Sequence, residues 1–165
     1  MTSTLTQQLS DLVLGIDHVA LAVADIEAAG QCYAALGFEP VAQSEVHGEH
    51  SGMRYAVWQS GDATLVLVQG TSPASQVSQF LNAFGAGMHH IAFAVSDLDA
   101  ALARATQAGV AADTPVVSDA GIRQAFLHRD EKTGVRIELI ERHGAPFSSR
   151  NVAQLFRVLE AKDLY

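Results

Sequence analysis

The sequence contains few cysteines and few basic residues, on which several functional classes of protein depend. It contains one cysteine, Cys32, so no disulfide can form within the chain, and this usage fits a cytoplasmic setting. Lysine and arginine number only 10 against 18 aspartate and glutamate residues, which gives a net charge of −8. Proteins that bind the phosphate backbone of nucleic acids need clustered basic residues. This charge balance therefore argues against a nucleic-acid partner.

Long hydrophobic runs are also missing. No segment approaches the roughly 20 apolar residues that span a bilayer, and residues 1–15 carry neither the basic start nor the long apolar core of a signal peptide. Hydrophobic residues nevertheless make up 48% of the chain and charged residues 17%, a balance typical of globular proteins. We therefore expect a cytoplasmic protein with a real hydrophobic core and no membrane partner.

What the chain does contain is an imperfect copy of itself. Residues 16–38 resemble residues 88–110, including an aspartate that begins each helical pattern (Asp25 and Asp97). Each copy reads as a strand, a helix that ends at a glycine, and then further strands. A single β-α-β-β-β unit cannot cover both faces of its sheet, so two of them are expected to pack together and to enclose a cavity.

The repeat predicts an α+β fold in one domain spanning residues 1–165. The fold would consist of two βαβββ modules paired around a metal-binding cavity, plus a C-terminal helix. Module one covers about residues 14–70, module two about 86–143, and the helical tail 150–164. Expected strands cover 18–23, 38–46, 54–59, 64–69, 90–95, 123–129 and 134–142, and expected helices cover 5–14, 26–37, 75–84, 97–109 and 151–164.

One position breaks the repeat. The alignment places His18 on His90, a displacement of 72 residues (90 − 18), and the same displacement places Val66 on Glu138 (138 − 66). Two equivalent histidines and one carboxylate without a counterpart are the ligand set of a 2-His-1-carboxylate site, which suits non-haem Fe(II). Because valine cannot bind a metal, three protein ligands would leave about three octahedral positions for substrate and O₂.

The carboxylate of Glu138 has an alternative interpretation. An ionised glutamate on an apolar strand is costly unless it is paired or coordinates a cation. Side chains alternate across a strand, so Arg136 and Arg142 share its face and either could be its partner. The repeat favours the metal site, because it aligns Glu138 with two histidines on equivalent strands. The remaining candidates are predicted to be structural: Asp25 and Asp97 as helix caps, His89 as a packed residue and Glu49 as a surface residue.

The repeated segments also resemble a known family. IDHVALAV, MHHIAFAV and GVRIELIE are similar to the vicinal oxygen chelate superfamily, which includes glyoxalases, bleomycin-resistance proteins, methylmalonyl-CoA epimerases and extradiol dioxygenases. Within it, the chain most resembles the catalytic C-terminal domain of 4-hydroxyphenylpyruvate dioxygenase and its relative hydroxymandelate synthase. The segments that support this are VHGEHSGMRYAV (46–57), SQVSQFLNAFGAGMHHIAF (75–93) and IELIERHGAPFSSRNVAQLFRVLE (137–160).

The resemblance implies roles for individual residues. His18, His90 and Glu138 match the iron ligands. The other matching positions lie in the pocket or next to it: Gln124, Phe126, Asn151, Phe156 and Gln76.

The chain departs from this pattern at several positions. These 165 residues include no segment that resembles the N-terminal domain of that dioxygenase, and Val152 and Arg136 stand where it has aromatic residues. Arg136 could point its guanidinium into the cavity and hold a substrate carboxylate. It could equally be an arginine in solvent at the end of a strand.

The implied function is an Fe(II)-dependent dioxygenase or hydroxylase that acts on a 2-oxo acid or similar chelating substrate with O₂. Another divalent metal is possible, and members of this superfamily lead us to expect a homo-oligomer. The alternative is a metal-dependent epimerase or lyase similar to methylmalonyl-CoA epimerase, in which Glu49 falls close to an acid-base residue. Val66 counts against the epimerase, because those enzymes usually supply a fourth ligand there. A metal-free binding protein, like those that confer bleomycin resistance, would need none of the three ligands.

Overall fold

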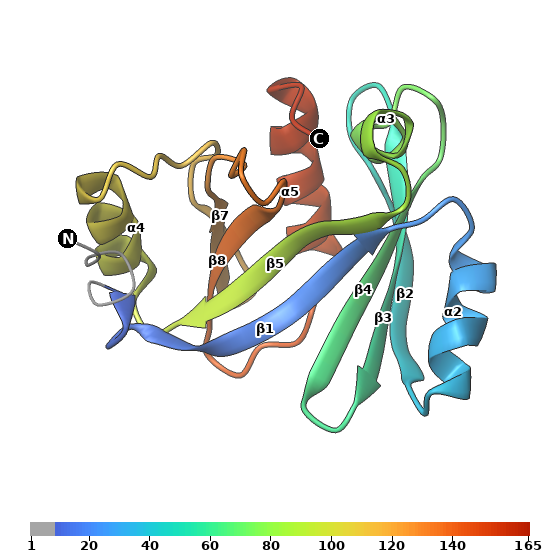
Figure 1. Cartoon of the computed structure of the whole chain (residues 1–165), viewed down its shortest axis with the longest axis horizontal. Coiled ribbons are helices and arrows are strands. Elements are labelled where there is room, and N and C mark those ends of the chain that lie inside the picture. Colours follow the sequence, from blue (N-terminus) through green and yellow to red (C-terminus); the bar gives the residue numbers. More distant parts are fainter. Residues whose placement is uncertain (1–8) are drawn as a thin grey trace. The chain divides into compact units, whose positions relative to one another are not determined.

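The computed structural model describes residues 9–165 (Figure 1). Within them, eight strands form one mixed sheet in the order β2-β3-β4-β1-β5-β8-β7-β6. The strands are β1 (Val13–Ala22), β2 (Glu39–His47), β3 (Gly52–Ser60), β4 (Ala63–Gly70), β5 (Gly87–Val95), β6 (Val117–Asp119), β7 (Ile122–Phe126) and β8 (Arg136–Arg142). The helices are α2 (Ile26–Ala35), α3 (Gln76–Phe84), α4 (Leu98–Gln107) and α5 (Ser149–Ala161). The α+β class with a C-terminal helix is confirmed, whereas the division into modules stays a prediction.

The largest differences from the expected elements lie at the start of the chain and before β7. The helix expected over residues 5–14 extends too far: Leu9 is helical, but residues 10–12 form a turn, and Val13 and Leu14 belong to β1. Residues 5–8 lie outside the described part. Strand β6 was not expected. It pairs with β7 through a two-residue turn in which Ala120 and Gly121 both have positive φ, at 51° and 82°. Such turns match the twist of a hairpin, but alanine is an unusual residue for this conformation, so no residue pattern indicated the turn.

The repeat is visible in the pairing of the strands. In the parallel pair β1–β4, Ala20 lies opposite Val66, and in the parallel pair β5–β8, Ala92 lies opposite Glu138. Each partner is displaced by the same 72 residues (92 − 20 and 138 − 66). The backbone therefore places Val66 and Glu138 in equivalent positions. Asp25 and Asp97 are confirmed as caps, since each side chain accepts a hydrogen bond of 2.9 Å from the amide three residues later.

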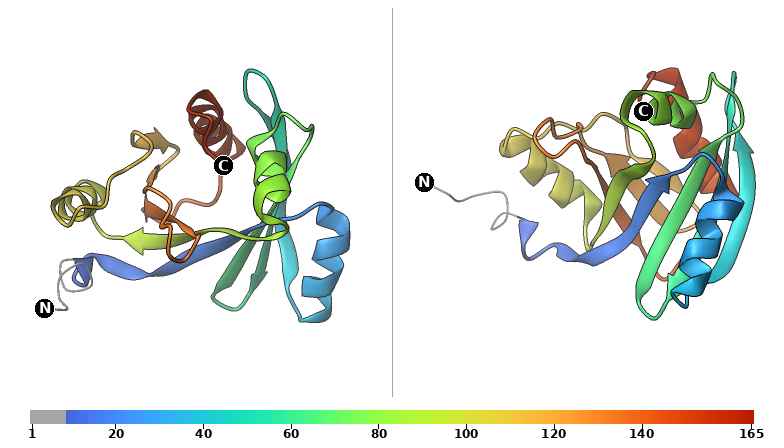
Figure 2. Two further views of the ribbon diagram at one scale, coloured as in Figure 1. Left: turned by 45° about the horizontal axis from the view of Figure 1, so that its top comes forward. Right: turned by 45° about the vertical axis from the view of Figure 1, so that its right-hand side comes forward.

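The chain divides into two compact units, of which one comprises residues 18–89 and 147–165. In this unit, α2 lies on one side of strands β2–β4 and α5 on the other (Figure 2). Ile26 on α2 packs with Ala56 and Leu67. The other side carries a larger apolar cluster, to which α3 and α5 both contribute: Ala20, Ala22, Val46, Met53, Tyr55, Val57, Val66, Val68, Val77, Phe80 and Phe156.

The second unit comprises the residues up to Asp17 together with residues 90–146. Helix α4 packs through Leu98 and Ala101 on the face of the strands that carries Leu139. The opposite face carries a small apolar cluster of Ala92, Ile122 and Ile140, with Ala145 packed against it. In the part of the chain that the structure describes, no helix is both long and apolar enough to cross a membrane.

Candidate metal centre

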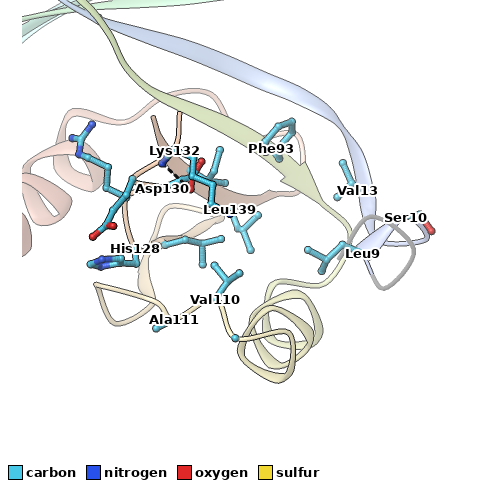
Figure 3. A pocket seen from close by; sticks show the side chains of 15 residues that line it. Leu9, Ser10, Val13, Phe93, Val110, Ala111, His128, Asp130, Lys132 and Leu139 are labelled. Carbon is cyan, nitrogen blue, oxygen red and sulfur yellow. Dashed lines mark hydrogen bonds between the residues drawn. The ribbon is translucent and has the colours of Figure 1, made fainter. Parts of the chain in front are cut away.

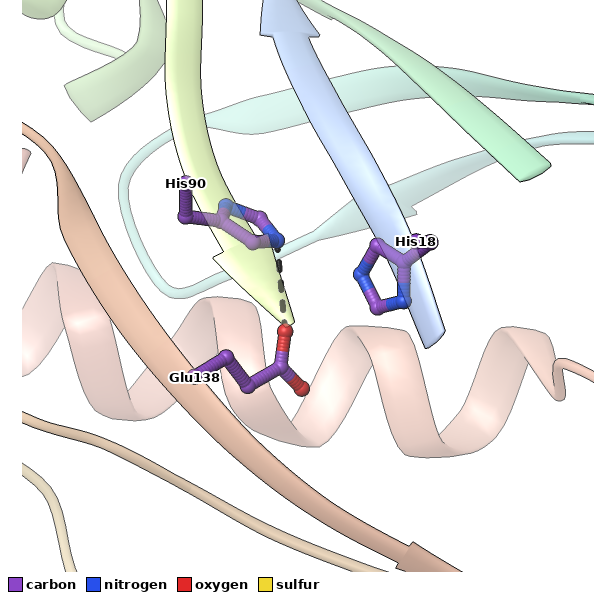
Figure 4. A group of neighbouring side chains, drawn as sticks. All are labelled: His18, His90 and Glu138. Atoms are coloured by element: carbon purple, nitrogen blue, oxygen red, sulfur yellow. Dashed lines mark ion pairs between the residues drawn. The ribbon is translucent and has the colours of Figure 1, made fainter. Parts of the chain in front are cut away.

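Three potential metal ligands come together as the repeat predicts. His18 lies on β1, His90 on β5 and Glu138 on β8, and one ligand atom from each lies within 4.8 Å of the others (Figure 4). His18 and Glu138 are 4% and 2% exposed. The Nε2 atom of His90 lies 3.2 Å from Oε2 of Glu138. The register explains this pair, because Glu138 lies opposite Ala92, two residues beyond His90 on the same face of β5.

The donor set fits a divalent cation. Two imidazole nitrogens and one carboxylate oxygen are the ligands of a facial triad, which suits Fe(II) and leaves other coordination positions open. A carboxylate as buried as that of Glu138 needs a partner or a cation. Both arginines proposed as its alternative partners pair with other carboxylates: Arg136 with Asp113 at 2.6 Å, and Arg142 with Asp17 at 2.7 Å. This favours coordination over an ion pair with arginine.

The position equivalent to Glu138 in the other half of the repeat is apolar. Val66 is 7% exposed and belongs to the same cluster as Ala20 and Val57, which lie opposite it on the two neighbouring strands. No carboxylate stands at this position of the repeat to act as a fourth ligand. A cation bound by His18, His90 and Glu138 would keep positions open for exchangeable groups.

Helix α5 and the segment before it contribute the residues on the side of His18. The ring of Phe147 lies 5.1 Å from the His18 imidazole at an interplanar angle of 72°. Phe156 and Asn151, both predicted to lie in the pocket, are buried on α5. Phe156 packs in the apolar cluster with Ala20, and its carbonyl accepts a hydrogen bond of 3.2 Å from Gln76.

Strand β7 contributes the residues on the side of His90. Phe126 lies opposite Glu138, and Gln124 lies opposite Ile140. Both β7 side chains are buried. The ring of Phe126 meets the His90 imidazole edge-on, with the centroids 4.9 Å apart and the planes at 83°. Phe126 therefore contacts a candidate ligand directly, a contact that the sequence did not reveal.

Arg136 is neither in solvent nor free of partners. Its side chain is 5% exposed, and Nη1 donates hydrogen bonds to Asp113 Oδ2 at 2.6 Å and to the carbonyl of Leu127 at 3.4 Å. The expectation of an arginine in solvent at the strand end is wrong. Burial raises the pKa of Asp113, but hydrogen bonds with His128 and Arg136 outweigh it and hold the pKa below its ordinary value.

The structure also places the residues predicted to be structural. His89 is buried, and its ring lies 4.9 Å from that of Phe80 on α3. The Glu49 side chain is 85% exposed in the turn between β2 and β3. Both placements agree with the structural interpretation from the sequence.

A hollow of about 920 Å³ lies on the other face of the strands that carry His90 and Glu138 (Figure 3). Its wall includes Phe93, Ile137 and Leu139, which alternate with the residues of the candidate metal centre along β5 and β8. Residues 128–132 form part of its lining. None of the residues predicted for the site line this hollow, so it is not part of the candidate metal centre.

Comparisons with known proteins show the family to which the fold belongs. Residues 17–126 match the profile of the Glyoxalase/Bleomycin resistance protein/Dioxygenase superfamily. The uncharacterised protein YqjC of Bacillus subtilis is 32% identical over 132 residues, which cover 78% of this chain and 93% of YqjC.

Two solved structures represent different activities within this fold. Methylmalonyl-CoA epimerase from Mycobacterium tuberculosis has 34% identity and a TM-score of 0.67, covering 82% of this chain and 91% of the epimerase. A mutant of 4-hydroxymandelate synthase from Streptomyces coelicolor has 22% identity and a TM-score of 0.79, covering 90% of this chain and 54% of the synthase. The comparisons therefore do not single out the dioxygenase branch that the sequence segments resemble.

Proposed function

Since the chain belongs to the glyoxalase/bleomycin resistance/dioxygenase superfamily, we propose that it is a metal-dependent enzyme that acts on a small chelating substrate. More narrowly, we propose an Fe(II)-dependent dioxygenase or hydroxylase whose substrate is a 2-oxo acid or a similar chelator. The observation that supports this proposal is the three-ligand set. His18, His90 and Glu138 gather within 4.8 Å, while buried Val66 occupies the position where the repeat could have supplied a fourth ligand.

The three ligands define what the protein itself supplies. His18, His90 and Glu138 would hold the metal, which when bound would accept the two oxygens of a chelating substrate and activate O₂. The surrounding side chains provide a dry environment, because Ala20, Ala92 and Phe126 are all at most 1% exposed. Exclusion of water strengthens the electrostatic interactions in such a site and limits side reactions.

The remaining predicted residues have proposed roles in substrate orientation. Gln124 carries the buried amide on β7 and would hydrogen-bond the substrate. Phe126 and Phe156 would provide apolar walls, and Asn151 a second amide from α5. Holding the substrate in a fixed orientation next to the metal lowers the activation free energy of their reaction, because the entropy of bringing them together is already lost on binding.

A metal-dependent epimerase is the second candidate, and sequence identity favours it. Methylmalonyl-CoA epimerases match this chain at 32–34% identity, above the 22% of the hydroxymandelate synthase. Proton transfer would require an acid-base group within hydrogen-bond reach of the substrate carbon. Glu49, the carboxylate suggested for this role, is 85% exposed. Its position and the apolar character of Val66 are the reasons for ranking the epimerase second.

Anaerobic reconstitution with Fe(II) and metal quantification, for the wild type beside Glu138→Ala, tests the metal site. We expect one iron per chain, lost in the variant, while Glu49→Ala keeps its iron as a matched surface control. Oxygen uptake and CO₂ release are then measured with a panel of aryl and alkyl 2-oxo acids.

Substrate-dependent oxygen uptake would support the oxygenase. Anaerobic exchange of the α-proton of methylmalonyl-CoA with Co(II)-loaded protein would instead establish the epimerase. A wild type that retains no divalent metal would overturn both proposals.

A further inference from the structure

The loop before β6 is bound to the end of β7 at Phe126. The Phe126 amide donates a hydrogen bond of 2.9 Å to the Thr114 hydroxyl. The Phe126 carbonyl accepts bonds from the amides of Asp113, at 2.8 Å, and Thr114, at 3.4 Å. Both backbone polar groups of Phe126 are thus satisfied by this loop rather than by another strand.

The loop is in turn fixed by a partly buried ion pair. The Asp113 side chain is 17% exposed and accepts a hydrogen bond of 2.6 Å from Arg136, whose side chain is 5% exposed. Arg136 also donates to the Leu127 carbonyl, one residue after Phe126. The guanidinium of Arg136, on β8, therefore hydrogen-bonds both the loop and the residue that follows β7. A charge pair as buried as this is seldom a net gain in stability over apolar packing, whereas it does define geometry.

Phe126 connects this arrangement with the candidate metal centre. Its ring is 1% exposed and meets the His90 imidazole edge-on at 4.9 Å. Histidine ligands need neighbours that fix the orientation of the ring, and changes to those neighbours typically weaken metal binding 10- to 100-fold. An edge-to-face ring contact restricts the tilt of the imidazole in this way.

We propose that Asp113 and Arg136 are positioning residues for the metal centre, which act by holding Phe126 edge-on against His90. This inference rests on the metal site of the proposed function. It assigns Arg136 a role different from binding a substrate carboxylate, because Nη1 is already engaged by Asp113 and by the Leu127 carbonyl. The pair keeps the His90 ring oriented so that Nε2 remains directed toward Glu138 (Figure 4).

Titration of the protein with Co(II), followed by its visible absorption, tests this role without any substrate. Asp113→Asn and Arg136→Met are expected to bind Co(II) about 10- to 100-fold more weakly than the wild type, with an altered absorption band. Asp99→Asn is the matched control. It removes the partner of another arginine, Arg123, at 2.9 Å on an exposed part of the same unit, and should leave both the affinity and the band unchanged.

The variant Phe126→Leu separates positioning from general destabilisation. It should weaken Co(II) binding by itself, and adding Asp113→Asn to it should cause little further loss, since the pair acts through the ring. If Asp113→Asn does not fold, Phe126→Leu still tests the proposal, because it removes the aromatic ring and leaves the ion pair between Asp113 and Arg136 intact. Losses that simply add in the double variant would overturn the inference.

The other outcomes are also decisive. Unchanged Co(II) affinity and absorption in folded Asp113→Asn would overturn the positioning role while leaving the proposed function intact. An Arg136→Met variant with normal Co(II) binding and a raised KM for an anionic substrate would return Arg136 to substrate binding. Failure of the wild type to bind Co(II) would overturn the proposed function, and this inference with it.

Discussion

The strand pairs β1–β4 and β5–β8 have the same register but carry different chemistry. Ala20 faces Val66 in the first pair, and Ala92 faces Glu138 in the second. Both positions are buried, at 7% for Val66 and 2% for Glu138. The backbone is thus repeated, while a single side chain decides which half supplies the carboxylate. The repeated backbone puts residues 66 and 138 at equivalent positions, and only the glutamate at 138 can bind a metal. The number of protein ligands therefore depends on the residue type at position 66.

The apolar packing of the two units differs as well. In the unit of residues 18–89 and 147–165, α5 adds Phe156 to a cluster that includes Val66. In the other unit, the face of the strands that carries Glu138 has a smaller cluster of Ala92, Ile122 and Ile140, together with the buried ring of Phe126. The half without a carboxylate ligand thus has the larger apolar cluster. The half with the carboxylate has a smaller cluster and a buried aromatic ring beside His90.

The largest expected effect comes from making the two halves alike. Glu138→Val places in the second half the residue that the first half already has, and it should abolish stoichiometric Fe(II) or Co(II) binding. Loss of a ligand weakens binding by more than the 10- to 100-fold typical of residues next to ligands. Isothermal titration with Co(II) measures the change.

The metal-free Glu138→Val protein should be as stable as the wild type or more so, because the desolvation cost of a buried carboxylate is removed and the imidazole of His90, its partner at 3.2 Å, carries no charge in its neutral form. Thermal unfolding in the presence of a chelator checks this. A variant that still binds one Co(II) per chain with wild-type affinity would show that Glu138 is not a ligand.

The second prediction tests the packing of α5. Phe156→Ala removes a 2% exposed ring from the apolar cluster around Val66 and should lower the free energy of unfolding by about 3–5 kcal/mol. Urea denaturation measures it. Phe84→Ala is the matched control in the same unit, since Phe84 is 61% exposed, and it should change the stability by well under about 1 kcal/mol. Equal losses in the two variants would mean that α5 does not form this core.

The sequence predicted the parts of the site that follow from periodicity. The displacement of 72 residues aligned His18 with His90 and isolated Glu138, and strand alternation placed these side chains on defined faces. The helix starts at Asp25 and Asp97 followed from the capping preference of aspartate. These features depend on local sequence patterns. The strand pairing in the structure shows the same displacement, since Ala20 pairs with Val66 and Ala92 with Glu138.

The sequence did not predict the environment of Phe126. Asp113 and Thr114 lie in a loop, and they reach Phe126 only because β7 returns beside them. The partner of Arg136 is separated from it by 23 residues. Such contacts depend on tertiary structure, and no spacing of residue types indicated them. Strand β6 was missed for a local reason, since its turn places Ala120 at positive φ, which is unusual for alanine.

The third prediction adds a ligand to the half that lacks one. Val66→Glu introduces a carboxyl group at the position equivalent to Glu138, among apolar neighbours such as Ala20 and Val57. Without metal, the variant should lose about 1–3 kcal/mol of stability, because the new polar group is buried. With a divalent metal, part of that loss should be recovered, and substrate-dependent oxygen uptake should fall because fewer open positions remain.

Val66→Leu is the control for Val66→Glu, since it changes volume without adding a ligand. Metal bound by His18, His90 and Glu138 should stabilise it no more than it stabilises the wild type. Thermal unfolding with and without Zn(II) compares the two variants. Equal shifts on adding Zn(II) in both would mean that position 66 does not face the metal.

The smallest expected effect concerns how α5 is attached to its own unit. The Glu160 carboxylate on α5 accepts hydrogen bonds from the Glu49 amide and the Ser51 hydroxyl, both at 2.6 Å, and from the His50 amide at 3.2 Å. Burial raises the pKa of Glu160, but these hydrogen bonds outweigh it and hold the pKa below its ordinary value of 4.5. We expect Glu160→Gln to lose about 1 kcal/mol at neutral pH, a modest loss because the carboxylate is half-exposed.

The pH dependence of this loss identifies the carboxylate as its cause. A group whose pKa is lower in the folded state stabilises the fold fully above its unfolded pKa, and the contribution disappears as the pH falls through the folded pKa. The difference in unfolding free energy between wild type and Glu160→Gln should therefore be constant above about pH 5.5 and shrink below the ordinary value of 4.5. Glu131→Gln, at an exposed position in the other unit, is the control for the change of residue type. A Glu160→Gln difference that persists unchanged at pH 3 would show that the carboxylate charge is not its cause, and no difference at any pH would mean that α5 is held by its apolar face alone.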